Sequence, residues 1–219
     1  MNIEFIGLPG VGKTTLLERM NTFLEQESIS LFSGNDNQRS TCYIRSILFI
    51  LKFIVLYPSS LKLVFTSFRW LIIKLSFRNC LNLSRKNKDQ QVFFSKTNGV
   101  LMPIITYTTQ RNPGNIVFDV SKVLASLPLP DVLIVVTADI DIVVDRYSNR
   151  GGLTLPDRIS REKVVINSDL YRSFSRGLSV VNEIVNLLQK KKVKIIQIDN
   201  NQDVDNKALK RIIGEINNG

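Results

Sequence analysis

Short apolar runs alternate with longer amphipathic segments along most of the chain. The apolar runs that have the length of strands cover residues 2–6, 29–32, 92–94, 131–137 and 193–198. The run at 131–137 is apolar and rich in β-branched residues after its first position. Such a run is typical of a strand that is buried on both faces, as in a parallel sheet.

The segments between these runs carry apolar residues at the spacing of one helix face. They predict helices over residues 14–26, 41–57, 60–81, 116–127, 139–149, 168–191 and 204–216. The second and third helices are separated at Tyr57-Pro58, because the residue before a proline avoids the α region. Strands that alternate with helices predict one α/β domain over residues 1–219, with about five parallel strands and helices on both faces.

Composition narrows the chemistry that this domain can perform. Of the 219 residues 44% are hydrophobic, which is enough for a core, and none is His. The lack of imidazole excludes Ser–His and Cys–His nucleophiles and His-ligated metals. Cys42 and Cys80 form no C-x-x-C motif, so reduced thiols are expected. The N-terminus carries an early acid and no basic region, so we expect no secretory signal and a cytoplasmic protein.

The net charge of +10 is concentrated in one segment. We call residues 37–90, which contain the predicted helices 41–57 and 60–81, the basic helical block. No acid occurs between Asn37 and Lys88, whereas ten basic residues do: Arg39, Arg45, Lys52, Lys62, Arg69, Lys74, Arg78, Arg85, Lys86 and Lys88. The remaining 19 Lys and Arg residues balance the 19 acids of the chain.

A phosphate-binding motif follows the first predicted strand. The sequence Gly7-Leu8-Pro9-Gly10-Val11-Gly12-Lys13-Thr14 matches G-x-x-x-x-G-K-[ST] and precedes a predicted helix. Its glycines let successive amides point at phosphate oxygens, and the helix adds its positive end. Lys13 is expected to bind the β- and γ-phosphates of ATP, and the Thr14 hydroxyl is expected to bind Mg²⁺.

The remaining motifs indicate which class of phosphate-loop protein this is. The GTPase signatures D-x-x-G and N-K-x-D are absent, as is the cassette signature L-S-G-G-Q. Three features of the chain resemble thymidylate kinases and related P-loop nucleotide kinases. They are the loop Gly7–Thr15, the Pro130-Asp131 pair before an apolar strand, and Arg146 with Arg150-Gly151 on the next helix. The resemblance implies that residues 150–168 form a lid over the substrate, with Arg158 as a further candidate for a lid arginine. It also implies a homodimer.

The two arginines also have a physical argument of their own. Arg146 and Arg150 are four residues apart, so they share one face of the predicted helix. Two guanidinium groups beside a phosphate loop would neutralise the charge on a phosphoryl group during its transfer. The alternative is a solvated pair on a surface helix that forms ion pairs with neighbouring aspartates.

The resemblance fails at one position. These kinases place a carboxylate at the end of the strand beside the phosphate loop. In this chain the run at 92–94 is followed by Ser95-Lys96-Thr97-Asn98-Gly99, without an acid. Asn98 can form hydrogen bonds but cannot take a proton. Asp119 and Asp139 are rival positions, and both fit ordinary residues at a helix surface or a strand end.

The basic helical block has three interpretations. Its helices can form core and a homodimer interface, with basic side chains that extend to water. They can lie on an anionic membrane surface. They can also form part of an anionic acceptor site, with Arg39, Arg69 or Arg78 as ligands. A membrane span is not expected, because the longest charge-free run, Phe53–Leu61, has nine residues and a span needs about 20. Nucleic acid is not expected as a partner, since no recognition element occurs.

The sequence therefore predicts an ATP- and Mg²⁺-dependent small-molecule kinase. The catalytic residues would be Lys13, Arg146 and Arg150, and the acceptor would be a nucleotide or another small molecule. The alternative is a P-loop protein that binds nucleotide without efficient transfer and acts at a membrane or on a partner.

Overall fold

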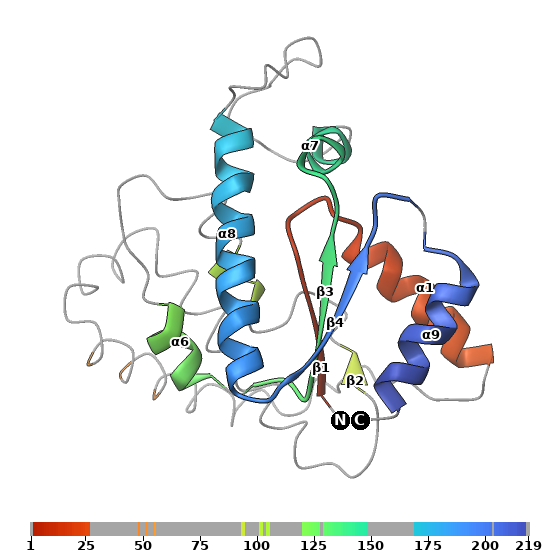
Figure 1. The fold of residues 1–219 in the computed structure, drawn as a ribbon, viewed down its shortest axis with the longest axis horizontal. Coiled ribbons are helices and arrows are strands. Elements are labelled where there is room, and N and C mark those ends of the chain that lie inside the picture. Colours follow the sequence, from red (N-terminus) through yellow and green to blue (C-terminus); the bar gives the residue numbers. More distant parts are fainter. Residues whose placement is uncertain are drawn as a thin grey trace.

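A computed structural model describes a sheet and the helices that pack around it. The described residues are 2–26, 48, 51, 55, 93–94, 101–102, 104–105, 120–127, 129–148, 169–202 and 204–217. The strands are β1 (Asn2–Ile6), β2 (Phe93–Phe94), β3 (Val132–Thr137) and β4 (Lys194–Asp199). The helices are α1 (Lys13–Gln26), α6 (Val120–Ser126), α7 (Ile140–Ser148), α8 (Asp169–Lys190) and α9 (Asn206–Asn217), as labelled in Figure 1.

The four described strands form one parallel sheet in the order β2-β1-β3-β4. In the register, Ile3 of β1 is paired with Phe94 on one side and with Val132 on the other. Residues 132–136 of β3 are all buried, as the apolar run predicted. Because parallel strands end at the same edge, the loops that follow β1, β3 and β4 meet there.

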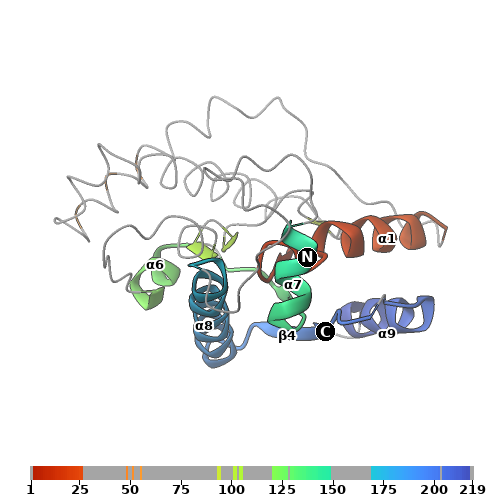
Figure 2. The ribbon, with the colours of Figure 1, turned by 90° about the horizontal axis from the view of Figure 1, so that it is seen from above.

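Helices cover both faces of this sheet. Figures 1 and 2 show α6 and α8 on one side of the strands and α1 with α9 on the other. Helix α9 reaches α1 through the ammonium of Lys210, which lies 5.8 Å from the centre of the Phe23 ring. Tyr147 of α7 packs edge to face against Phe174 of α8, with ring centres 5.3 Å apart. The predicted α/β fold with a parallel sheet and two helical layers is confirmed.

Helix α8 ends in a Schellman motif that brings the chain directly into β4. Val193 donates from its amide to the carbonyl of Leu188 at 3.1 Å, and Lys192 donates to Gln189 at 3.0 Å. These two bonds define the motif, whose penultimate position adopts the left-handed conformation. Lys192 occupies that position with a φ of 60°, although glycine is the residue that favours it.

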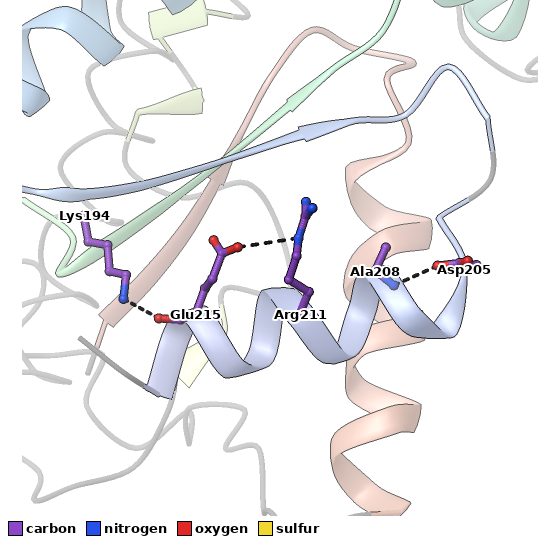
Figure 3. Close-up of polar contacts among 5 residues, drawn as sticks. All are labelled: Lys194, Asp205, Ala208, Arg211 and Glu215. Atoms are coloured by element: carbon purple, nitrogen blue, oxygen red, sulfur yellow. Dashed lines mark hydrogen bonds and ion pairs between the residues drawn. The ribbon is translucent and has the colours of Figure 1, made fainter.

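Helix α9 is fixed at both ends by polar contacts (Figure 3). At its start the Asp205 carboxylate accepts a hydrogen bond of 2.7 Å from the amide of Ala208, which is the contact of an N-cap. Near its end Lys194 of β4 donates from Nζ to the carbonyl of Glu215. The Glu215 carboxylate lies 3.5 Å from Nε of Arg211, one turn earlier. One contact thus caps the start of α9, and another joins its last turn to β4.

A buried carboxylate interrupts the apolar face of β1. Glu4 is 1% exposed, and its Oε1 accepts a hydrogen bond of 2.5 Å from the amide of Leu101. Ile104 donates in turn to the carbonyl of Leu101 at 3.1 Å, so the carboxylate meets the start of a short turn. A buried carboxyl group needs such a partner, because burial of a polar group without one costs several kcal/mol.

Most of the predicted elements in the described ranges are confirmed within one or two residues. The predicted helix 116–127 is represented by α6, which begins at Val120 among the described residues. The predicted strand 29–32 and nearly all of the predicted helices 41–57 and 60–81 lie outside the described residues. In the predicted helix 41–57 the structure describes Leu48, Leu51 and Val55. All three are helical, and they are 60%, 53% and 78% exposed. None of the helices in the described ranges is both long and apolar enough to cross a membrane.

Candidate functional site

The phosphate loop lies at the carboxyl edge of the sheet, between β1 and α1. Among the described strands, β1 has β2 on one side and β3 on the other. After β2 the chain therefore crosses to the other side of β1 before it forms β3. In open α/β sheets this kind of position forms a crevice in which ligands bind. The motif found in the sequence thus occupies the part of the fold where a nucleotide is expected.

Two glycines of the loop let other segments approach its backbone closely. A Cβ atom on Gly10 would lie 3.0 Å from the carbonyl oxygen of Val143 and 3.3 Å from Cβ of Tyr147, both in α7. At Gly12, where φ is +95°, a Cβ atom would lie 2.3 Å from Nδ2 of Asn200. The loop is consequently packed against α7 on one side and against the segment after β4 on another.

Lys13 folds back over the loop that precedes it. Its Nζ donates to the carbonyl oxygen of Gly7 at 2.9 Å and to that of Leu8 at 2.7 Å. The side chain is half-buried, so its ammonium is held at the mouth of the loop. An ammonium in this position can exchange a carbonyl for a phosphate oxygen with a small movement. The placement fits the role predicted for Lys13.

Thr14 and Thr15 lie in the first turn of α1, and both are exposed. The first amides of a helix have no carbonyl partner within it, and the helix dipole makes this end attractive to anions. A hydroxyl is a hard oxygen ligand, and Mg²⁺ bound with nucleotide takes few protein ligands beside phosphate and water. The Thr14 hydroxyl therefore fits the metal role predicted for it, and phosphates would supply further oxygens.

Arg146 lies on α7, the helix that follows β3. Its Nη1 donates to the main-chain carbonyl of Asn200 at 2.9 Å, and the side chain is half-buried. Because α7 touches Gly10, this arginine belongs to the same edge of the sheet as the phosphate loop. Its role in neutralising the transferring phosphoryl group stays a prediction. The other predicted site residues lie outside the described residues: Arg39, Arg69, Arg78, Asn98, Arg150 and Arg158.

Asn200 and Asn201, directly after β4, form hydrogen bonds to the segments that follow β1 and β3. Neither was predicted from the sequence. Asn200 is 8% exposed and donates from Nδ2 to the carbonyl oxygen of Val11 at 2.7 Å. Its own amide donates to the carbonyl of Thr137 at 2.8 Å. The Oδ1 of Asn201 accepts a hydrogen bond of 2.7 Å from the amide of Asp139. The segments after β1, β3 and β4 are thereby joined.

A signal for these asparagines was present in the sequence. They come directly after the predicted strand 193–198, and carboxyl ends of parallel strands gather at one edge. Polar residues at that position are therefore expected near the phosphate loop. Asparagine is also common in turns, so the sequence alone does not distinguish this pair from ordinary turn residues.

Comparison with known proteins gives a fold but no relative in sequence. No protein-family profile and no curated protein sequence matches the chain. Among solved structures, deoxyadenosine kinase from M. mycoides with bound dATP has 16% identity and a TM-score of 0.53, over 99% of this chain and 100% of that one. The same kinase with the products dCMP and a flexible dCDP has 15% identity and a TM-score of 0.56, and with dCTP 16% and 0.54, each over 100% of both chains.

These similarities establish the fold of the chain. The likeness to the fold of these kinases extends over 99–100% of the chain, so the predicted α/β fold is confirmed by comparison as well. At 15–16% identity the likeness does not carry an activity to this chain. The narrower resemblance to thymidylate kinases stays a prediction.

Proposed function

We propose that the protein is an ATP- and Mg²⁺-dependent phosphotransferase that acts on a nucleoside, a nucleotide or a related small acceptor. The observation that carries this proposal is the position of Lys13, whose ammonium lies on the carbonyls of Gly7 and Leu8 within a complete phosphate loop. The fold that the chain shares with nucleoside kinases supports the same conclusion.

The described residues would divide the work as follows. Amides of the loop and of the first turn of α1 bind the donor phosphates, and Lys13 adds a positive charge to them. Thr14 provides an oxygen to Mg²⁺, which neutralises phosphate charge when it is bound. Arg146, and Arg150 four residues later in the sequence, would stabilise the charge that spreads over the transferred group.

The acceptor side has no carboxylate in the expected stretch of sequence. Residues 95–99 contain no acid. An acceptor that is itself a phosphate needs no strong base, because its oxygens are ionised at neutral pH. This favours a nucleotide over an unphosphorylated nucleoside as the acceptor. A nucleoside acceptor would require a base from another part of the chain.

A transfer screen tests the proposal. The protein is incubated with ATP, Mg²⁺ and, separately, nucleosides, nucleoside monophosphates and sugars, and phosphorylated products are measured. We expect one class of acceptor to be phosphorylated by the native protein and not by Lys13→Ala. Turnover by Lys13→Ala at the native rate would contradict the role of the loop.

The absent acid supports a second candidate function. A P-loop protein without a group to activate the acceptor could bind ATP and act on a membrane or a protein partner without efficient transfer. The two functions differ in one measurement, since only a kinase should consume ATP faster when its acceptor is added. A rate of ATP consumption that no acceptor raises would favour the second function.

We also propose that the basic helical block binds a partner, either a second copy of the chain or an anionic membrane surface. Leu48, Leu51 and Val55 are exposed apolar residues within it. A homodimer interface would bury them, and so would an anionic membrane surface attracted by the ten basic residues of the block. A cytoplasmic location is compatible with either.

A further inference from the structure

Asn200 is the one described polar side chain that reaches the backbone of the phosphate loop from the opposite end of the sequence. It is 8% exposed, and its Nδ2 donates to the carbonyl oxygen of Val11 at 2.7 Å across a separation of 189 residues. An amide of this kind fixes a loop carbonyl in one orientation, because the bond is short and lies away from competing water. The turn of the loop beside Gly12 is thus set by a residue outside the motif.

The fit between Asn200 and the loop is steric as well as polar. The side-chain amide of Asn200 fills the space beside Gly12, because a Cβ atom on Gly12 would lie 2.3 Å from Nδ2 of Asn200. The main chain of Asn200 is also held in place, since its backbone N–H donates to the carbonyl oxygen of Thr137 in β3. Asn200 therefore has little freedom, and a loop bonded to it has little freedom either.

The same residue anchors the arginine of the neighbouring helix. The main-chain carbonyl of Asn200 accepts a hydrogen bond of 2.9 Å from Nη1 of Arg146. One residue thus touches the loop that would hold the donor phosphates and the guanidinium that would meet the transferred group. A displacement of the Asn200 peptide would move both contacts together.

We propose that Asn200 is a positioning residue that holds the phosphate loop and Arg146 in a fixed relation to each other. Its side-chain amide keeps the loop in the form that binds ATP, and its carbonyl keeps Arg146 directed at the same edge. The first half of this inference requires only that the loop binds nucleotide. The second half rests on the proposed phosphoryl transfer.

ATP binding tests the first half. The dissociation constant is measured by calorimetry for the native protein, Asn200→Ala, Asn200→Asp and the matched control Gln197→Ala, an exposed amide on β4. We expect Asn200→Ala to weaken binding about tenfold. We expect Asn200→Asp to weaken it further, because a carboxylate of the same shape cannot donate to Val11 and repels phosphate. Gln197→Ala should bind as the native protein does.

The order of the two variants separates positioning from packing. Asn200→Asp preserves the volume of the side chain, so a role in packing alone would leave it closer to the native protein than Asn200→Ala. It also decides the test if Asn200→Ala does not fold. Binding by a folded Asn200→Asp within about twofold of the native constant would overturn the proposal.

A double-mutant cycle tests the link to Arg146. Turnover is measured for Asn200→Ala and Arg146→Ala singly and together, at saturating ATP and acceptor. Asn200→Ala keeps the main-chain carbonyl that Arg146 bonds but releases the peptide from Val11. If the bond to Val11 fixes this peptide and through it Arg146, replacing Asn200 should lower kcat much less in the Arg146→Ala background than in the native one. Equal reductions in both backgrounds would overturn the link. A native protein that phosphorylates no acceptor would contradict the proposed function, and the ATP-binding comparison would still decide the role of Asn200 in the loop.

Discussion

The side-chain amide of Asn200 packs so closely against Gly12 that a Cβ atom on Gly12 would lie 2.3 Å from Nδ2 of Asn200. The glycine of the phosphate motif is therefore required twice, once for its φ of +95° and once for the side chain that packs against it. Replacement of this glycine should disturb the loop even where the backbone angle could be tolerated.

Gly12→Ala should weaken ATP binding and lower stability together. The positive φ alone costs a residue with a Cβ atom about 1–2 kcal/mol, and the clash would also displace Asn200 from Val11. We expect at least a tenfold loss of ATP affinity, corresponding to about 1.4 kcal/mol, measured by calorimetry with thermal unfolding alongside. Unchanged affinity in a folded Gly12→Ala would contradict the packing described for this glycine.

Gly214→Ala should have the opposite effect on stability. Gly214 lies inside α9, and a Cβ atom added there meets nothing within 4 Å. Alanine in a helix interior is about 1 kcal/mol more favourable than glycine, which raises the melting temperature of a domain of this size by about 2–4 °C. ATP affinity should stay the same. A lower melting temperature would show that Gly214 is needed for close packing.

Lys13→Met should abolish most ATP-dependent turnover while the chain stays folded. Methionine preserves the half-buried aliphatic stem but removes the ammonium that lies on Gly7 and Leu8. Loss of one preorganised charge at a transferring group lowers turnover by about a hundredfold or more. The matched control is Lys207→Met, an exposed lysine of α9, which should turn over ATP as the native protein does. Equal loss in both variants would point to a nonspecific charge effect.

Lys192→Gly should stabilise the protein. Lys192 holds the left-handed position of the motif that ends α8, with a φ of 60°. Glycine adopts this angle without the clash of a Cβ atom, and the gain exceeds the entropy that glycine adds to the unfolded chain. We expect about 0.5–1 kcal/mol in the free energy of unfolding, measured by urea denaturation. Lys191→Gly, one residue earlier, should give no gain, and an equal gain there would contradict the explanation.

The basic helical block should reveal its partner by its response to salt. Co-sedimentation with anionic vesicles that falls steeply as salt rises would support a membrane surface, because exposed charges are screened within about 10 Å at 0.1 M salt. A homodimer would instead persist at high salt in sedimentation equilibrium and dissociate when Leu51 or Val55 is replaced by Asp. A monomer that binds no vesicles would contradict both proposals.

Local patterns predicted the described fold well where a single segment determines the outcome. The run 132–136 is apolar at every position, and a strand that is buried throughout needs no information from elsewhere. The phosphate loop is likewise defined by eight consecutive residues. The bounds of α1, α7, α8 and α9 agree with the predicted helices within one or two residues, since the amphipathic pattern ends where the chain leaves the core.

Residues whose role depends on a distant partner were missed. Glu4 stands in an apolar run, and its partner Leu101 lies 97 residues away. Asn200 has a side chain common in turns, and only the folded sheet brings it to Val11. In both cases a polar group is tolerated in the core because of a bond that sequence spacing cannot reveal. The spacing of Arg146 from Arg150 makes Arg146 a candidate, whereas no spacing indicates that its partner is the carbonyl of Asn200.

The bond between Asn200 and Val11 also has a consequence for how the protein is made. A ribosome that synthesises from the N-terminus releases the phosphate loop long before residue 200 exists, at about 5–20 residues per second. Until β4 joins the edge of the sheet, the nascent loop lacks the contact that shapes it. Nucleotide binding should therefore reach its full strength late in synthesis, and chains interrupted before β4 should bind ATP more weakly even though their signature motif is complete.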